Sequence, residues 1–255
     1  MKKKETALVL EQTTIATDVY SMWIQTSLAK EAAPGKFISV YPGDKSTLLP
    51  RPISICEVDQ EKESLRIVYR IAGKGTTEFS GYQAGDKVQI LGVLGNGFPL
   101  EKAEGKRAFL IGGGIGIPPI LELAKQIQGE KKIIAGYRNE LFLEEELRKS
   151  GELYVATEDG SQGSRGTVLD AIRENGLEAD VIFACGPMPM LRALKEYAEK
   201  NGIEAYISLE ERMACGVGAC LGCVCKTKEV DHHSQVKNTR ICTDGPVYDA
   251  REVEI

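Results

Sequence analysis

MACGVGACLGCVCK, residues 213–226, contains four of the seven cysteines of the chain, and Cys242 follows it. The first three of these thiols have the spacing C-x4-C-x2-C, and with a distant fourth they give the spacing of plant-type [2Fe-2S] clusters. The four thiols of this pattern are Cys215, Cys220, Cys223 and Cys242. Small residues between them let the backbone wrap closely around one point. The stretch therefore predicts an electron-carrying centre, with Cys225 as a fifth candidate thiol.

The length and composition favour a protein of two domains with a small appendage. The chain has 255 residues, of which 42% are hydrophobic and 27% are charged, as in ordinary soluble proteins. Its net charge of −5 argues against nucleic-acid binding. No apolar run reaches the ~20 residues that cross a bilayer, and the basic N-terminus lacks a signal-peptide core. We therefore expect a cytoplasmic protein without a membrane partner, in which clustered cysteines favour metal ligation over disulfides.

The first hundred residues contain short β-type runs that alternate apolar and polar residues and are separated by Pro, Gly and Asp. The runs are TALVLEQ, DVYSMWIQTS, KFISVYP, RPISICEVD, SLRIVYRIA and DKVQILGVL. Evenly spaced short strands predict a closed β-barrel. One helical candidate, TTEFSGY, interrupts them directly after Gly73-Lys74-Gly75.

Two features of this region suggest a phosphate-bearing ligand. Arg51 opens RPIS and is suited to bidentate pairing with a phosphate, while Ser54 is a small hydrogen-bonding group for a ring. GKGT, residues 73–76, leads into the helical candidate, where free N–H groups and glycines form an anion site. Taken alone, Arg51 is equally a surface charge and GKGT an ordinary loop. Together, before a nucleotide-type domain, they favour flavin binding.

From residue 107 to residue 208 the pattern changes to alternating strands and helices. The strand candidates are RAFLIGGG, KKIIAGYR, ELYVATEDG, ADVIFACGP and EAYISLE, and the helical ones are PPILELAKQIQ, ELFLEEELRKSG, TVLDAIRENG and MPMLRALKEYAEKNG. This alternation predicts a parallel sheet with right-handed crossovers. Such sheets bind nucleotides at the carboxyl ends of their strands.

Three groups of residues lie at those strand ends and are candidates for binding NAD. The first is a glycine turn that departs from G-x-G-x-x-G but suits a pyrophosphate; glycine turns also serve packing. The second is an acidic pair that would accept from ribose hydroxyls and repel a 2′-phosphate, which favours NAD over NADP, unless both acids are solvated. The third holds a cysteine expected to face the nicotinamide, although a cysteine there is usually buried packing. These groups are Gly112, Gly113, Gly114 and Gly116; Glu158 and Asp159; and Cys185, Gly186 and Pro187.

With these pieces in order, the chain resembles the ferredoxin-NADP reductase superfamily, in which an FAD barrel precedes an NAD(P) domain. Within it, the chain resembles the electron-transfer subunits of NAD-linked, type B dihydroorotate dehydrogenase of pyrimidine (UMP) synthesis. The resemblance covers nearly the whole chain. It is carried by RPISI (51–55), IVYR (67–70), GKGT (73–76), LGNGFPL (94–100), IGGGIGIPP (111–119), ACGPMPML (184–191), LEERMACGVGACLGC (209–223) and CTDGPV (242–247).

The resemblance implies a set of site residues in this sequence. It implies FAD contacts from Arg51, Pro52, Ile53, Ser54, Val68, Tyr69, Arg70, Gly75 and Thr76, and cluster ligation by Cys215, Cys220, Cys223 and Cys242. Ser54 would lie near the flavin N5 and Cys185 near the nicotinamide, whereas Cys225 would not be a ligand. On the residues alone, Glu210 and Glu211 could guide docking but are expected to be surface charges, and His232 and His233 are expected to be solvated loop residues.

The resemblance also implies how the chain works. Two copies would dock on two copies of an FMN-containing catalytic subunit that oxidises dihydroorotate. Electrons would then cross the [2Fe-2S] cluster and FAD of this flavoprotein to NAD+, so the chain would be an oxidoreductase component that needs its partner. We expect three regions: a barrel at 1–101, an NAD domain at 102–208 and a cluster lobe at 209–255.

Two other functions stay open on the residues. An NAD(P)H-linked flavin and iron-sulfur reductase subunit could serve ferredoxin, sulfide or an oxygenase, although fewer residues follow Glu210 than the ~90 of a complete ferredoxin domain. A non-redox, zinc-binding regulatory module is the other, because four cysteines can hold zinc tetrahedrally. The spacing C-x4-C-x2-C is unusual for structural zinc, which more often shows two C-x2-C pairs.

Overall fold

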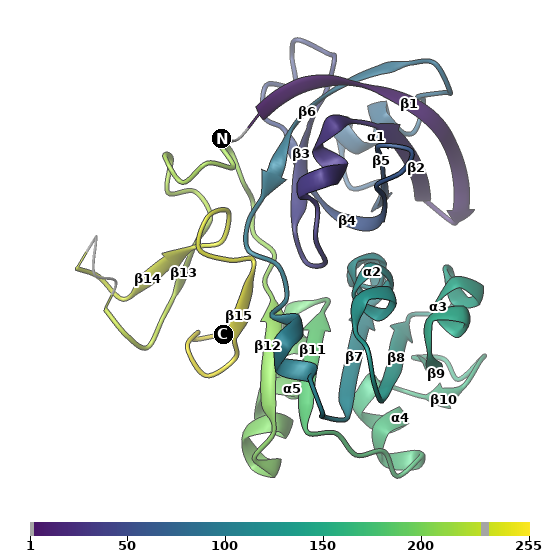
Figure 1. Cartoon of the computed structure of the whole chain (residues 1–255), viewed down its shortest axis with the longest axis vertical. Helices are drawn as coiled ribbons and strands as arrows, with labels where there is room; N and C mark the ends of the chain where they lie inside the picture. Colours follow the sequence, from purple (N-terminus) through teal and green to yellow (C-terminus); the bar gives the residue numbers. More distant parts are fainter. Residues whose placement is uncertain (1–2, 231–234) are drawn as a thin grey trace.

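The computed structural model describes residues 3–230 and 235–255. Figure 1 shows a barrel, a separate sheet flanked by helices, and a C-terminal segment beside both. The barrel is closed, with the strand order β1-β2-β5-β4-β3-β6. Its strands are β1 (Lys3–Ala16), β2 (Val19–Gln25), β3 (Phe37–Tyr41), β4 (Arg51–Asp59), β5 (Ser64–Arg70) and β6 (Lys87–Leu94). The predicted barrel is therefore confirmed.

Alternation along the strands builds the barrel core, because successive side chains point to opposite faces. On β3, Ile38 and Val40 belong to the cluster that fills the barrel, whereas Phe37 belongs to a different cluster outside it. A helix is present at the predicted place as α1 (Lys74–Phe79), but it begins inside GKG, with Gly73 at its N-cap, and ends before Ser80. Short 3-10 turns complete this region at η1 (Ser27–Glu31) and η2 (Leu100–Ala103).

The second body is a seven-stranded sheet with the order β10-β9-β8-β7-β11-β12-β15. Five of its strands were predicted, and they are parallel to one another. They are β7 (Ala108–Gly113), β8 (Lys131–Tyr137), β9 (Glu152–Thr157), β11 (Val181–Cys185) and β12 (Glu204–Ser208). The chain order reverses between β7 and β11, and such a switch point is where open α/β sheets bind ligands.

The sequence did not indicate the two edge strands of this sheet. β10 (Ser164–Arg165) pairs with β9, and β15 (Val247–Asp249) pairs antiparallel with β12. Both are too short to show a period-2 pattern. β15 comes from the C-terminal region, so the segment that follows the cysteine stretch is anchored on the α/β sheet.

Four helices and one 3-10 turn accompany the sheet: η3 (Gly114–Gly116), α2 (Pro118–Gln126), α3 (Glu144–Ser150), α4 (Val168–Glu174) and α5 (Met188–Asn201). The helix expected over 140–151 begins only at Glu144. Leu143 has a φ of 60°, in the left-handed region, so the helix cannot include this residue or extend toward the N-terminus through it. The side chain of Phe142 is buried and packs into the core.

The C-terminal lobe contains a small two-stranded sheet, β13 (Val224–Lys226) paired with β14 (Asn238–Arg240). Figure 1 shows this sheet to the left of both larger bodies. His232 and His233 lie outside the described residues, so their predicted loop positions stay a prediction.

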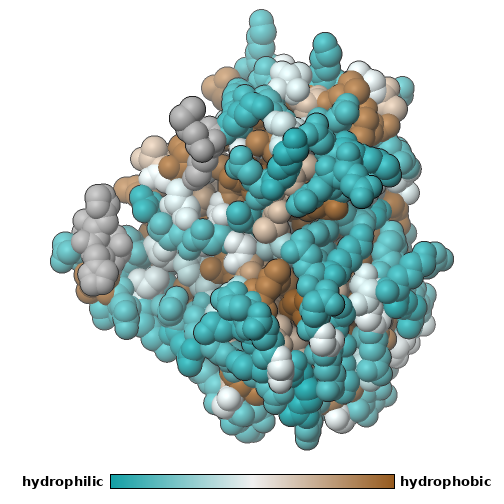
Figure 2. All heavy atoms as spheres, in the orientation of Figure 1, coloured by the Kyte–Doolittle hydropathy of each residue, from teal (hydrophilic) through white to brown (hydrophobic). Residues whose placement is uncertain are grey.

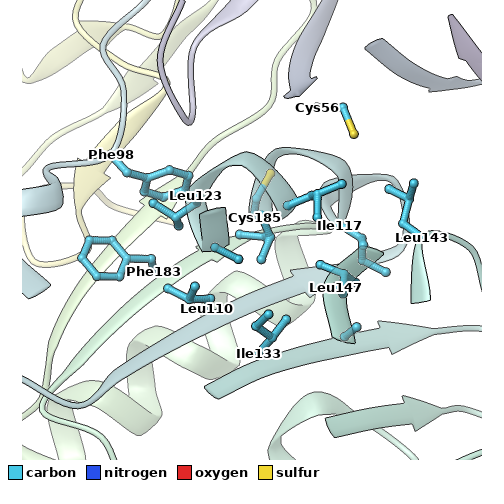
Figure 3. Packing of buried hydrophobic residues seen from close by; sticks show 14 of the residues in the cluster. Cys56, Phe98, Leu110, Ile117, Leu123, Ile133, Leu143, Leu147, Phe183 and Cys185 are labelled. Atoms are coloured by element: carbon cyan, nitrogen blue, oxygen red, sulfur yellow. The ribbon is translucent and has the colours of Figure 1, made fainter. Parts of the chain in front are cut away.

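One hydrophobic cluster joins the barrel to the α/β sheet. Figure 3 shows Cys56 of the barrel strand β4 above residues of the second body, including Ile117 and Cys185. An ion network adds to this interface: the buried Arg66 of β5 contacts Glu57 and, at 3.4 Å, Glu146 of α3. Glu57 also contacts Lys125 of α2. The barrel and sheet are thus held in a fixed relation at the place where they meet.

The face drawn in Figure 2 is mainly hydrophilic, with apolar residues in small scattered groups. Within residues 3–230 and 235–255, no helix combines the length and apolar character that crossing a membrane requires.

Candidate functional site

A pocket of about 850 Å³ opens between the barrel, the switch point of the sheet and the C-terminal lobe. Most of the residues expected to contact FAD line it. They are Arg51, Pro52, Ile53, Ser54, Val68, Tyr69, Arg70 and Thr76. They come from β4, β5 and α1, so three neighbouring elements of the barrel present them to one space. The pocket volume lies within the range of cofactor sites.

Gly75, the remaining expected FAD residue, lies beneath Arg51. A Cβ atom added to Gly75 would stand 2.8 Å from Nε and 2.9 Å from Cζ of Arg51, which is closer than real Cβ contacts. Glycine at this position therefore lets the guanidinium lie flat against the start of α1. The guanidinium also donates through Nη1 to the Leu49 carbonyl at 2.6 Å. This cradle fits a group that must present positive charge to a phosphate.

Hydrogen bonds within the protein hold two of the pocket-lining side chains, Thr76 and Tyr69, in place. The Thr76 hydroxyl accepts from Ala72 N at 2.8 Å and donates to Gly73 O at 3.0 Å, so it holds the turn before α1. The Tyr69 hydroxyl donates to Gln12 Oε1 at 2.8 Å, and its ring stacks on Tyr20 with centroids 5.8 Å apart. These contacts fix Thr76 and Tyr69, which both line the pocket.

The glycine turn after β7 is packed closely against the end of β11. A Cβ atom on Gly116 would be 2.4 Å from the Cys185 carbonyl oxygen, and one on Gly113 would be 2.5 Å from Met190 Sδ. Gly112 is blocked in the same way by Ile117. Gly114, by contrast, has a φ of +52° and no atom within 4 Å of an added Cβ. Packing thus explains three of the four glycines, while Gly114 leaves open space for a ligand.

Cys185 is fully buried at the switch point, behind the pocket wall. Burial raises the pKa of its thiol, with a further effect from Glu210, and Ser208 hydrogen-bonds it. Ser208 and Glu210 themselves line the pocket. Cys185 is therefore one residue layer from the space where a nicotinamide would meet a flavin.

The acidic pair after β9 lies at an exposed strand end. Asp159 accepts from the backbone N–H of Ser161 at 3.0 Å and from its hydroxyl at 2.7 Å. These bonds, the hydroxyl first, hold the pKa of Asp159 below its usual value. The Glu158 side chain is exposed beside it. Both carboxylates stand at the carboxyl edge of the sheet, as the prediction requires.

Glu210 and Glu211 are exposed, as expected of surface charges, and both also line the pocket. The Glu210 side chain is accessible through the pocket, yet protein atoms surround it, and this desolvation raises its pKa. No sequence signal distinguishes a pocket acid from a surface acid here.

The four cysteines of the C-x4-C-x2-C pattern and Cys242 are brought together as two interacting pairs. Cys215 contacts Cys220, and Cys242 contacts Cys223. Each sulfur also accepts from a backbone N–H. The donors are Val217 and Cys220 to Cys215, Gly222 to Cys220, Cys242 to Cys223, and Gly218 to Cys242, at 3.2–3.4 Å.

This arrangement fits anionic sulfurs. Desolvation acts against the Cys215 thiolate, but N–H groups of the loop, including those of Val217 and Cys220, outweigh it and lower its pKa to about 6. Burial, followed by the neighbouring Cys223, raises the pKa of Cys242. A [2Fe-2S] cluster takes four thiolates, two at each iron, and the two sulfur pairs match that demand. Among the described residues, no three or more His, Cys, Asp or Glu side chains form a site for a single metal ion.

Cys225 lies apart from these pairs on β13, where it faces Thr239 of β14. It is half-buried against the core, and burial, followed by the charge of Glu211, raises its pKa to about 11. Its place on β13, outside the two sulfur pairs, suits a packing role.

Known proteins resemble the chain over its whole length. Residues 210–254 match the family described as the iron-sulfur cluster binding domain of dihydroorotate dehydrogenase B. Two curated relatives are the dihydroorotate dehydrogenase B (NAD(+)) electron transfer subunits of Geobacillus sp. (strain WCH70) and Bacillus cereus (strain B4264). Each is 43% identical to this chain, and each alignment covers 99% of this chain and 99% of the relative.

Solved structures agree with the fold. A structure of an NADH-dependent reduced ferredoxin-NADP oxidoreductase superposes with a TM-score of 0.84 at 26% identity, covering 97% of this chain and 89% of the other. A ferredoxin reductase of carbazole 1,9a-dioxygenase, 18% identical, shares the fold with a TM-score of 0.67 and covers 79% of this chain and 67% of its own. The predicted resemblance is confirmed: at 43% identity over 99% of its length, the chain belongs to the family of dihydroorotate dehydrogenase B (NAD(+)) electron transfer subunits.

Proposed function

We propose that this chain is the electron transfer subunit of an NAD+-linked dihydroorotate dehydrogenase in UMP biosynthesis. Electrons from dihydroorotate reach it through the FMN of a partner catalytic subunit, and it delivers them by way of [2Fe-2S] and FAD to NAD+. The observation that carries this proposal is the continuity of the two sites. Residues 208–213 line the flavin-type pocket, and Cys215 follows two residues later, so one segment belongs to both sites.

Three cofactors are proposed, each with its own residues. FAD is held by Arg51, Pro52, Ile53, Ser54, Val68, Tyr69, Arg70, Gly75 and Thr76; the cluster by Cys215, Cys220, Cys223 and Cys242; and NAD by Gly112, Gly113, Gly114, Gly116, Glu158, Asp159, Cys185, Gly186 and Pro187. When bound, a flavin exchanges a hydride with NAD+ and single electrons with an iron-sulfur centre, which nicotinamide cannot do.

The residues of this chain bind, orient and exclude water. Arg51, supported by Gly75, would hold a phosphate of FAD, and Tyr69 lines the same pocket. Ser54 offers a hydroxyl to the ring nitrogen that exchanges hydride. Cys185 fills the space behind Ser208 and so sets how closely a nicotinamide approaches. Since the dihydroorotate chemistry belongs to the partner, this chain needs no acid-base pair for that substrate.

The proposed organisation is a barrel at 1–101, an NAD domain at 102–208 and a cluster lobe at 209–255, in a cytoplasmic heterotetramer of two such chains and two FMN-containing subunits. The name of the relatives, electron transfer subunits, supports a catalytic partner. Two exposed apolar residues of the cysteine loop, Val217 at 42% and Leu221 at 63%, support docking at the lobe.

Co-expression with a candidate FMN subunit tests the proposal. The complex is expected to co-purify and to reduce NAD+ with dihydroorotate, whereas this chain alone is expected to oxidise NADH with dyes but not to oxidise dihydroorotate. A chain that reduces ferredoxin with NADH and associates with no FMN subunit would favour the alternative of a ferredoxin-serving reductase, to which the 26% identical structure points.

A further inference from the structure

The cluster lobe rests on the outer surface of the FAD barrel, on strands β3 and β6. Because side chains alternate along a strand, Phe37 and Ser39 of β3 face away from the barrel interior that Ile38 and Val40 fill. Phe37 packs in the same hydrophobic cluster as Leu94 of β6 and the thiols Cys223 and Cys242. The proposed cluster site and the barrel wall thus share one core.

The cysteine loop touches this wall at Ser39. A Cβ atom added to Gly216, the neighbour of Cys215, would lie 3.1 Å from Ser39 Oγ and 3.2 Å from Leu94 Cδ1. The lobe is also tied to the barrel nearby, because Asn96 donates to the Asp244 carbonyl at 3.0 Å and to the Gly245 carbonyl at 2.6 Å. These bonds hold the segment that follows Cys242 beside the end of β6.

Ser39 is the anomaly in this contact. It is 0% exposed, and among the described residues its Oγ is the one fully buried side-chain nitrogen or oxygen without a hydrogen-bond partner. A buried hydroxyl without a partner is costly, and alanine at this position would avoid that cost. Its surroundings are apolar side chains of the barrel wall and the backbone of the cysteine loop. Gly216 follows Cys215 directly, so the Ser39 hydroxyl lies beside the loop that carries the proposed cluster ligands.

We propose that the Ser39 hydroxyl donates a hydrogen bond to a sulfur of the [2Fe-2S] cluster and raises its reduction potential. This inference rests on the proposed function. Reduction adds negative charge to the cluster, so a donor at sulfur stabilises the reduced form more than the oxidised form. The FAD barrel would then tune the cluster directly, through a residue outside the ligand loop.

An anaerobic redox titration followed by electron paramagnetic resonance tests the inference on the complete, cofactor-loaded complex. We expect Ser39→Ala to lower the midpoint potential by an about tenfold change in the equilibrium constant, about 59 mV for one electron. Ser64→Ala is the matched control. Ser64 is also a buried barrel serine, but it lies at the start of β5, where it pairs with Gln25 and Asp59. Its potential is expected to equal that of the wild type.

A second pair keeps the test decisive if Ser39→Ala loads poorly. Ser39→Thr and Ser39→Val have the same shape and differ in the hydroxyl, so the valine variant is expected to have the lower potential. In the wild type, exchange into D2O should shift an Fe–S stretching band in the resonance Raman spectrum, and this shift should shrink in Ser39→Val relative to Ser39→Thr.

Equal potentials for the threonine and valine variants, with intact cluster signals, would overturn the inference and leave the proposed function standing. A wild-type complex without any iron-sulfur signal would overturn both, so the two failures are distinguishable.

Discussion

Replacing Gly75 with alanine is expected to weaken FAD binding while leaving the barrel folded. The new Cβ would lie 2.8–3.1 Å from three atoms of the Arg51 guanidinium, so the guanidinium must move out of its cradle. A hydrogen bond to a charged group contributes about 1.5–3 kcal/mol. Losing it corresponds to a dissociation constant for FAD that is about 10- to 150-fold higher.

The sign of the stability change separates this effect from damage to the fold. Gly75 lies in α1, where alanine stabilises a helix by about 0.5–1 kcal/mol relative to glycine. The apoprotein should therefore unfold at the same or a slightly higher temperature although it binds FAD more weakly. Flavin fluorescence titration gives the dissociation constant, and a thermal melt gives the stability.

Two further variants complete the test. Gly81→Ala is the matched control, since the nearest atom to its Cβ would be the Glu78 carbonyl oxygen at an ordinary 3.4 Å. Gly75→Ala should have no further effect once Arg51→Ala is present, because both changes remove the same contact. An FAD dissociation constant for Gly75→Ala within twofold of the wild type would refute the role given to Arg51.

The remaining predictions concern the cluster and the interface. Cys242→Ser is expected to abolish the iron-sulfur absorbance, while Cys225→Ser retains it; the reverse would exchange the two assignments. Glu122 of α2 is buried and accepts a hydrogen bond from Val58 N at 3.0 Å, and desolvation raises its pKa. Its contribution to the stability of the fold is therefore complete below the ordinary pKa of Glu. This contribution is lost as the pH rises through the pKa of Glu122 in the folded state. Glu122→Gln should therefore be more stable than the wild type in urea at pH 8, with the difference vanishing near pH 4, and a less stable variant at pH 8 would contradict this.

Local pattern was sufficient for much of the fold. The alternation in β6 and the runs between Gly and Pro identified the barrel strands, and the spacing of the cysteines identified the loop whose sulfurs the structure pairs. RPIS and GKGT were recognised because phosphate sites commonly combine an arginine with a glycine-rich helix start. Each of these two motifs spans only four residues. These signals are local, and the sequence displays them directly.

The features that escaped prediction depend on contacts between distant segments. β15 has three residues and exists because β12 offers it an edge. Glu210 is an exposed acid, and its place among the pocket-lining residues depends on barrel residues distant in the sequence. Ser39 is an ordinary serine in an alternating strand, and its significance follows only from the loop of Gly216 lying against it.

Stopped-flow absorbance of the reconstituted complex under anaerobic conditions tests the central claim most directly. After dihydroorotate is added, the account predicts that the iron-sulfur and FAD bands of this chain bleach and that NADH then appears at 340 nm. The Cys242→Ser complex should still reduce its FMN but form no NADH. NADH formation at the wild-type rate in that variant would contradict the claim that electrons reach NAD+ through the cysteine loop.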